Sequence, residues 1–264
     1  MNIFDTIWHR KLKRPYRLSK VIDEGEGQSV VLLHGLASSS TTWKPLVNLL
    51  DKKDWRITAF DLLGFGSSPK PDWKAYRVED HVQAVLAAIN RARLKKPIVL
   101  IGHSMGCLVA THIAYTRPRL IKRLVLYQPP LFADIPEFQA HMRRRNMYFK
   151  FYKHAADKPH HVMAYIKLLG RTASRFSNLL SNKEALIPFK RSLKNTILEQ
   201  RAYEELTETA IPTDIISGRL DVFVTNKELK KMFAQNPCIK LHKISETHYV
   251  NKRAGKFIAK ILTK

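Results

Sequence analysis

The chain has 264 residues, of which 45% are hydrophobic and 9% are aromatic. This composition is typical of a packed globular protein and excludes a disordered chain, and no uninterrupted apolar stretch reaches the roughly 18 residues that a membrane-spanning helix needs. The 46 Lys and Arg residues exceed the 22 Asp and Glu residues and give a formal net charge of +24. Such a charge leaves three classes of partner open: nucleic acid, an anionic membrane surface and an acidic substrate.

The positive charge is spread nearly evenly along the chain, with one dense basic segment near the N-terminus. Residues 10–20 contain basic side chains and no acidic one, namely Arg10, Lys11, Lys13, Arg14, Arg17 and Lys20. Neither zinc-finger spacing nor an RNA-binding signature lies beside them. We interpret the charge as a basic, solvated surface with no obligatory nucleic-acid partner, and a weak association with an anionic surface through these residues stays open.

The two cysteines, Cys107 and Cys238, fit neither a disulfide framework nor a metal-binding knuckle. Residues 1–20 lack the continuous apolar region of a secretory signal. The paired histidines at 160–161 have no carboxylates at ligand spacing around them. We therefore expect a cytoplasmic protein with no cofactor and no metal ion, and the sequence leaves its oligomeric state open.

Short apolar runs alternate with amphipathic helical stretches along the first half of the chain. The predicted strands are 29–33, 56–60, 97–101 and 121–127, and the predicted helices are 42–50, 78–94 and 108–115. Strands return at 215–216 and 239–244, and a last helix is predicted at 252–262. This alternation predicts an α/β fold with a mostly parallel central sheet and helices on both faces.

The alternation stops between residues 132 and 206, where no strand is predicted. Helical pieces follow one another there, such as 138–153 and 187–206. A connection of about 75 residues is too long for an ordinary loop in a compact domain. We therefore predict a core domain made of residues 1–131 and 207–264, with residues 132–206 inserted as a helical lid.

Residues 102–106 read Gly-His-Ser-Met-Gly and match the G-x-S-x-G motif. The motif lies between the strand predicted at 97–101 and a helix that starts at about residue 105. A serine on such a sharp turn is held above the edge of the sheet, and the residues two positions to either side must lack a bulky side chain. The N-terminus of the next helix offers backbone N–H groups to a developing oxyanion. In this context the motif predicts that Ser104 is a nucleophile.

Together with four other motifs, this turn resembles the α/β-hydrolase fold superfamily, and specifically its branch with a helical lid over a Ser–His–Asp site. The motifs follow the family's order along the chain: His34-Gly35-Leu36, residues 61–68, residues 102–106, Gly218-Arg219-Leu220-Asp221, and His248. The resemblance implies that Ser104 is the nucleophile, Asp221 the orienting acid and His248 the general base. One departure is that Thr247 stands where the family usually has a glycine.

The chemistry of the residues supports the assignment of the base. A serine hydroxyl attacks a carbonyl only with a base within hydrogen-bond reach. His248 follows the last predicted strand, at the sheet edge where ligands gather in open parallel sheets. We expect the side chain of His103 to leave the turn in another direction and His34 to have a structural role.

The choice of the acid rests on position within the predicted sheet. Asp221 comes just after a strand and Gly218, at the same edge as the serine. Asp61 is its main competitor but precedes a Gly-x-Gly turn, and Asp214 falls too early in its strand. The fold's alternative acid position, after the strand at 121–127, is occupied by Gln128.

These residues predict acyl-enzyme chemistry on a small-molecule ester or ketone. The oxyanion would rest on the backbone N–H groups of Leu36 and Met105. Because position 104 is a serine and not an aspartate, the alkyl-enzyme ester of related dehalogenases and epoxide hydrolases is excluded. We expect hydrolysis of carboxylic esters of small or medium apolar substrates.

Three alternatives stay open. Lidded relatives with the same triad hydrolyse C–C bonds of vinylogous diketones, and Arg171 or Arg175 could bind the carboxylate of such a substrate. The second alternative is acyl transfer to an acceptor other than water. The third belongs to another class: a ligand receptor with little turnover. The lid contains apolar side chains that suit either a pocket roof or a packing face, namely Met142, Met147, Tyr148, Phe149, Phe151, Tyr152 and Met163.

Overall fold

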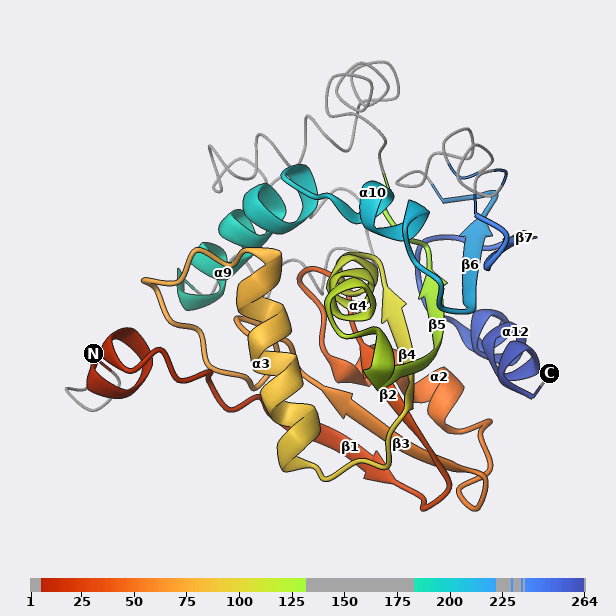
Figure 1. The fold of residues 1–264 in the computed structure, drawn as a ribbon, viewed down its shortest axis with the longest axis horizontal. Coiled ribbons are helices and arrows are strands. Elements are labelled where there is room, and N and C mark those ends of the chain that lie inside the picture. Colours follow the sequence, from red (N-terminus) through yellow and green to blue (C-terminus); the bar gives the residue numbers. More distant parts are fainter. Residues whose placement is uncertain (1–5, 132–182, 222–228, 230–233, 235, 264) are drawn as a thin grey trace.

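A seven-stranded sheet forms the centre of the computed structural model, which describes residues 6–131, 183–221, 229, 234 and 236–263 (Figure 1). The strand bounds are β1 Lys20–Glu24, β2 Gln28–Leu33, β3 Trp55–Phe60, β4 Ile98–His103, β5 Ile121–Tyr127, β6 Thr213–Gly218 and β7 Ile239–Ile244. Their order across the sheet is β1-β3-β2-β4-β5-β6-β7. Only the β1–β3 pair is antiparallel. The predicted α/β fold with a mostly parallel sheet is therefore confirmed.

Strand β1 is the element of this sheet that sequence analysis missed. Its residues read Lys-Val-Ile-Asp-Glu, and only Ile22 is buried. An edge strand with one buried side chain has no continuous apolar run, and its antiparallel pairing with β3 depends on a partner far along the chain. The pattern of buried parallel strands therefore could not predict it.

Helices cover both faces of the sheet. The helix bounds are α2 Lys44–Val47, α3 Val78–Arg91, α4 Met105–Thr116, α9 Lys183–Ser192, α10 Ala202–Thr207 and α12 Lys252–Leu262. Helices α3 and α4 pack in one hydrophobic cluster, whereas α2 and α12 pack in another on the opposite face. The helix predicted at 42–50 is shorter and begins as a 3-10 turn, η2 Ser40–Trp43. None of the helices in the described part of the chain is long and apolar enough to cross a membrane.

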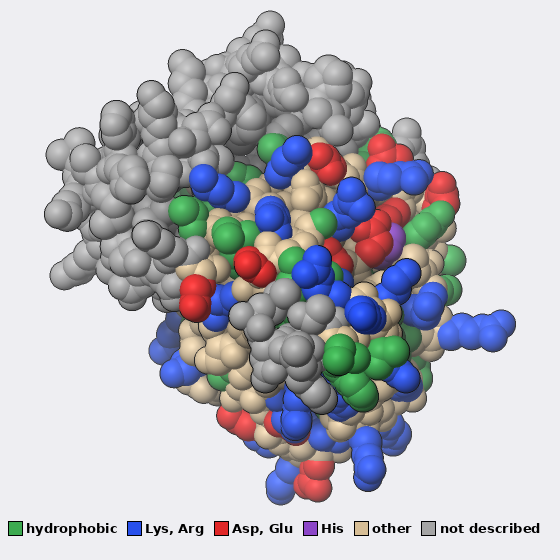
Figure 2. Space-filling model, turned by 90° about the vertical axis from the view of Figure 1, so that its left-hand side faces the viewer, with side chains coloured by type: hydrophobic (Ala, Val, Ile, Leu, Met, Phe, Trp, Pro, Cys, Tyr) green, Lys and Arg blue, Asp and Glu red, His purple; other side chains and the backbone are tan. Residues whose placement is uncertain are grey.

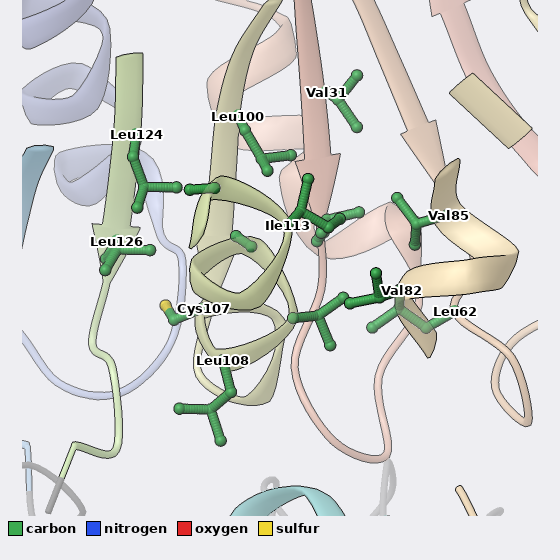
Figure 3. Packing of buried hydrophobic residues seen from close by; sticks show 14 of the residues in the cluster. Val31, Leu62, Val82, Val85, Leu100, Cys107, Leu108, Ile113, Leu124 and Leu126 are labelled. Carbon is green, nitrogen blue, oxygen red and sulfur yellow. The ribbon is translucent and has the colours of Figure 1, made fainter. Parts of the chain in front are cut away.

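Helix α4 is buried on most of its circumference because it lies between the sheet and two other helices, α3 and α10. Its side chains Cys107, Leu108 and Ile113 pack in the cluster that also contains Leu100 and Leu124 of the sheet (Figure 3). Interiors packed in this way resist displacement. The N-terminus of α4, which carries the G-x-S-x-G serine, is therefore held by the core.

The predicted lid is described only in its C-terminal part. There the helix predicted at 187–206 is replaced by α9, a π-helical turn η5 (Leu193–Leu198) and α10, with a break between η5 and α10. Thr196 bonds to the carbonyl of Tyr76, and Asn195 bonds to the carbonyl of Ala75, at 2.7 and 2.6 Å. Residues 132–182, including the helix predicted at 138–153, lie outside the described residues, so the lid and its bounds stay a prediction.

Candidate active site

Ser104 lies at the turn between β4 and α4 in a left-handed backbone conformation, with a φ of 52°. A non-glycine residue rarely adopts this φ, and holding it there costs about 1–3 kcal/mol. The Ser104 N–H donates to the carbonyl of Tyr127 at 3.1 Å, and its carbonyl accepts from the N–H of Cys107 at 2.8 Å. A Cβ on Gly102 would lie 2.6 Å from the Cα of Cys107, and one on Gly106 would lie 2.4 Å from a carbonyl oxygen of β2. The turn therefore requires both glycines of the motif.

The structure brings Ser104, His248 and Asp221 into one chain of hydrogen bonds. The Oγ of Ser104 lies 3.0 Å from Nε2 of His248, and Nδ1 of the same ring lies 2.7 Å from Oδ2 of Asp221. The Asp221 side chain is fully buried. Because an ionised carboxylate only accepts hydrogen bonds, Nδ1 carries the proton and Nε2 is the nitrogen that accepts from the serine hydroxyl.

Gly218, at the end of β6, begins the turn that positions Asp221. The N–H of Asp221 donates to the Gly218 carbonyl at 3.2 Å. The N–H of Gly218 donates to Oε1 of Gln128 at 2.7 Å. A Cβ at Gly218 would lie 2.2 Å from Nε2 of Gln128 and 2.2 Å from the carbonyl oxygen of Glu246. The turn that carries the acid therefore packs directly against the segment that leads to His248.

Three side chains at the ends of β4 and β5 bind consecutive carbonyls of the loop 247–249, and we call this set the carbonyl clamp. The Nε2 of Gln128 donates to the first carbonyl at 2.8 Å, and Nε2 of His103 donates to the second at 2.8 Å. The hydroxyl of Tyr127 lies 3.3 Å from the first carbonyl and 3.1 Å from the third. The clamp fixes the backbone on both sides of the residue whose ring faces the serine.

The clamp explains how the site accommodates Thr247 in place of the family's usual glycine. The carbonyl of Thr247 is held from β5, and His248 lies within hydrogen-bond distance of Ser104. Sequence reasoning missed the contribution of Gln128 and treated it only as a vacant acid position. The signal that could have found it is that Gln128 directly follows a strand, at the edge of the sheet where Ser104 lies.

His34 and Gly35 place the next peptide beside the serine. A Cβ on Gly35 would lie 3.0 Å from the Cβ of Ser104. Nδ1 of His34 donates to the Gly35 carbonyl at 2.7 Å, and its Nε2 accepts from the N–H of Leu62 at 2.9 Å. Because the peptide unit is planar with its C=O and N–H opposed, the first bond fixes the direction of the Leu36 N–H. Burial lowers the pKa of His34, which keeps Nε2 able to accept.

The two competing carboxylates are bonded elsewhere in the fold. Asp61 is buried and accepts from the N–H and hydroxyl of Ser40 at 2.7 and 2.6 Å, and from the N–H of Ser67 at 2.8 Å. Asp214 is bonded to Nε of Arg123 at 2.8 Å and to a histidine of β7 at 2.7 Å. Both carboxylates hold backbone elements together, Asp61 at a turn and Asp214 within the sheet.

Other buried titratable groups near the site stay neutral at neutral pH. Burial lowers the pKa of His81 to about 4. Burial, and then the neighbouring His248, lower the pKa of His103 to about 3. Burial raises the pKa of the Cys107 thiol, which donates to the carbonyl of Tyr127 at 3.3 Å. These groups therefore act through packing and hydrogen bonds.

Within the described ranges, no group of three or more His, Cys, Asp or Glu side chains is arranged to hold a metal ion. The lid side chains that sequence analysis considered for substrate contact, among them Arg171 and Arg175, lie outside the described residues. The same holds for the paired histidines at 160–161.

A family model described as alpha/beta hydrolase fold matches residues 28–250, which include all five motifs quoted above. The chain is 36% identical over 111 residues to the probable lysophospholipase BODYGUARD 4 of Arabidopsis thaliana, a match that covers 42% of this chain and 27% of the relative. It is 32% identical over 110 residues to the (E)-2-((N-methylformamido)methylene)succinate hydrolase of Acinetobacter baylyi, covering 42% of this chain and 41% of the relative. The match thus spans less than half the length of either relative.

Solved structures share the fold over nearly the whole chain. The enol-lactonase from Burkholderia xenovorans LB400 aligns with a TM-score of 0.70, over 93% of this chain and 95% of that chain. The sequence identity in this alignment is 18%. At such an identity the likeness is evidence for the fold and not for the reaction.

Proposed function

The chain belongs to the alpha/beta hydrolase fold family, and we propose that within it the protein is a serine hydrolase that cleaves carboxylic esters of small or medium apolar substrates. The observation that carries this proposal is the unbroken chain of hydrogen bonds from Ser104 through His248 to Asp221, at 3.0 and 2.7 Å. A serine in this arrangement has the base that its hydroxyl needs for attack on a carbonyl carbon.

In the proposed reaction, the Ser104 oxygen attacks the ester carbonyl while Nε2 of His248 takes the hydroxyl proton. The tetrahedral intermediate collapses, and the alcohol leaves with the proton from Nε2. Water then attacks the acyl-serine, gives its proton to the same nitrogen, and the carboxylic acid departs as the serine oxygen is reprotonated. Asp221 stays ionised throughout and stabilises the imidazolium form of His248.

The oxyanion of both intermediates would bind the backbone N–H groups of Met105 and Leu36. Met105 is the first residue of α4, where an N–H has no acceptor within its own helix. The Leu36 N–H is oriented by the bond between the His34 ring and the preceding carbonyl. One donor of this kind contributes about 2.7–4 kcal/mol to transition-state stabilisation.

The choice of an ester over other acyl compounds is supported by the plant relative, whose name, probable lysophospholipase, denotes cleavage of a carboxylic ester. The bacterial relative is named as a succinate hydrolase, so its substrate carries carboxylates. The name of this substrate contains a formamide group and no ester, so the experiment must fix both the bond class and the size of the acyl group.

The test begins with a fluorophosphonate probe, which labels an activated serine covalently. We expect labelling of the wild-type protein and no labelling of Ser104→Ala. A series of p-nitrophenyl esters, from acetate upward in chain length, then measures kcat/KM and locates the acyl size that the site prefers.

The outcomes separate the alternatives. Labelling without cleavage of any ester in the series would replace ester hydrolysis by C–C hydrolysis or acyl transfer. Absence of both labelling and a burst of p-nitrophenol would instead identify the protein as a binding protein that has kept the hydrolase fold.

A further inference from the structure

Exposed hydrophobic side chains concentrate at the N-terminus of the described chain. Ile7, Trp8 and Leu12 are 48%, 42% and 54% exposed. They are three of the eight large hydrophobic side chains that are exposed among the described residues, and they lie within six positions of one another. Single exposed hydrophobic residues are ordinary on protein surfaces, whereas a local group of them marks an interaction site.

The segment is anchored to the fold by other side chains. His9 stacks on Tyr16 with ring centroids 3.7 Å apart, and its Nδ1 donates to the carbonyl of Arg14 at 2.7 Å. The Arg10 guanidinium lies 5.5 Å from the centre of the Trp73 ring, whose N–H donates to the Tyr16 hydroxyl at 3.2 Å. The polar and basic side chains thus make the contacts with the protein, while the aliphatic ones face outward. From Ile7 to Arg14, every side chain except that of His9 is exposed, so the segment lacks the buried apolar face that a surface helix usually has.

The exposed apolar side chains are surrounded by cations. Between residues 7 and 17, the basic side chains are all exposed, and no acidic residue interrupts them: Arg10, Lys11, Lys13, Arg14 and Arg17. Figure 2 views the side of the molecule on which the N-terminus lies, and Lys and Arg side chains there border exposed hydrophobic ones. We call residues 7–17 the N-terminal patch.

A groove of about 550 Å³ lies between the N-terminal patch and α3. Its lining includes the cations Arg10, Lys13 and Lys74 beside the Trp73 ring, together with a single acid, Asp80. That acid is already paired with Lys74 at 2.8 Å. The groove therefore offers positive charge at the edge of the apolar group, as an anionic headgroup would require.

We propose that the N-terminal patch docks the protein on an anionic lipid bilayer. Ile7, Trp8 and Leu12 enter the interface between headgroups and acyl chains, and the flanking Lys and Arg side chains contact lipid phosphates. Interfacial segments combine these same elements: a group of apolar residues that includes Trp, and a border of basic residues that extend toward the headgroups. The proposal does not depend on the reaction at Ser104.

A nucleic acid would use the same cations, but it would leave the aliphatic side chains unexplained. Binding to phosphates and bases gains from Lys, Arg and stacked aromatic rings. Ile7 and Leu12 have no π-face to stack on a base, and they gain free energy only by leaving water for an apolar phase. The aliphatic side chains therefore favour the bilayer, and they give the experiment its discriminating variants.

The test uses the full chain with two kinds of vesicle, phosphatidylcholine alone and phosphatidylcholine with about one third phosphatidylglycerol. We expect co-sedimentation with the anionic vesicles only, weakening as salt rises. The tryptophan emission should shift to the blue on binding, because Trp8 is the most exposed of the four tryptophans: Trp43 is fully buried, and Trp55 and Trp73 are half-buried. Trp8→Phe should keep most of the binding and lose most of this shift.

Two double variants separate the apolar and the electrostatic contributions. Ile7→Ser with Leu12→Ser should abolish the blue shift and most of the binding. Lys11→Gln with Arg17→Gln should weaken binding about 25-fold, since each basic side chain near an anionic surface contributes roughly fivefold. The matched control, Lys95→Gln with Lys256→Gln, removes the same charge from two exposed positions, one in the loop after α3 and one on α12. It should bind as the wild type does.

Thermal unfolding of each variant shows that the fold is kept, because every substituted side chain in these double variants is exposed. Equal binding to both kinds of vesicle, or no loss of binding in the Ile7 and Leu12 variant, would overturn the proposal. Binding to a DNA duplex that survives that variant, with no binding to vesicles, would also overturn it and assign the patch to nucleic acid.

Discussion

Gln128 and Thr247, which are 119 positions apart in sequence, are joined by a hydrogen bond of 2.8 Å from the Gln128 side-chain amide to the Thr247 carbonyl. The same amide accepts from the N–H of Gly218 at 2.7 Å. Gly218 begins the turn to Asp221, and Thr247 precedes His248. One buried side chain therefore sets the spacing between the proposed acid and the proposed base, and it does so through backbone atoms of both loops.

We expect Gln128→Met to lower kcat about 10- to 100-fold with little change in KM. Methionine has a similar volume, but it leaves the Gly218 N–H without its partner, at a cost of about 1–3 kcal/mol for a buried group, and it leaves the Thr247 carbonyl only the longer bond from the Tyr127 hydroxyl, at 3.3 Å. The loop 247–249 then samples positions from which the His248 ring does not reach Ser104. Steady-state kinetics with the preferred p-nitrophenyl ester measures the effect.

A control distinguishes positioning from general destabilisation. Ile89→Val removes one methylene group from the core under α3, in the hydrophobic cluster that does not contain Tyr127, and costs about 0.5–1.5 kcal/mol. It should lower the melting temperature and leave kcat unchanged. If the two variants lose kcat in proportion to their loss of stability, Gln128 has no positioning role.

The identity of the acid is tested by two buried aspartates that differ in their partners. Asp221→Asn should lower kcat about 10⁴-fold, because an amide cannot hold the tautomer of His248 that accepts from Ser104. Asp214→Asn should keep activity and lower the free energy of unfolding by about 1–3 kcal/mol, since it weakens the bond to Arg123. The reverse result, activity lost only at position 214, would disprove the proposed triad.

Gly35 and Leu36, the neighbouring residues of the proposed oxyanion site, should respond differently to substitution by alanine. Leu36→Ala keeps the backbone N–H and should change kcat/KM by less than about tenfold, because the proposed donor is the main chain. Gly35→Ala places a methyl group 3.0 Å from the Cβ of Ser104 and 3.2 Å from Nδ1 of His103. We expect a larger loss in kcat from this variant, measured on the same ester. A larger loss from Leu36→Ala would move the oxyanion site away from this peptide.

Much of the fold was predictable because buried parallel strands read as short apolar runs. The strands at 121–127 and 239–244 and the helix at 252–262 match their predicted bounds. Helix α4 begins at Met105, where the G-x-S-x-G motif predicted its start, although the apolar pattern alone indicated only 108–115. The order of motifs also predicted which side chains meet at the sheet edge, because strand ends in a parallel sheet share one side.

The carbonyl clamp was not predictable from the same reasoning. The side chains of His103, Tyr127 and Gln128 bind backbone carbonyls. Every residue has such a carbonyl, so the sequence does not indicate which of them are bound. The partners of these side chains lie more than 100 positions away and are brought close by the pairing of β5 with β6 and of β6 with β7, the strand that precedes the loop 247–249. Sequence patterns thus identify groups that perform chemistry by residue type, and they miss groups that position other residues through the main chain.

Stability should fall in acid because of buried neutral histidines, and His81 is the clearest case. Burial lowers its pKa from 6.5 to about 4, and its Nε2 bonds to Ser192 at 3.2 Å. Between about pH 4 and pH 6.5, the His81 ring binds a proton in the unfolded chain and not in the folded chain. The free energy of unfolding therefore decreases as the pH falls below 6.5, by about 2 kcal/mol at pH 5 from this residue alone.

His112 gives the matched control, because its pKa shift has the opposite sign. Its bond to Glu205, 2.6 Å long, raises its pKa above 6.5, so it stabilises the fold at low pH and loses that contribution as the pH rises through the raised value. Chemical unfolding at pH 5 and pH 7.5 measures how much lower the free energy of unfolding is at pH 5. His81→Gln should make this difference smaller, and His112→Gln should make it larger. A wild-type protein whose stability is equal at both pH values, with both variants parallel to it, would contradict the assigned protonation states.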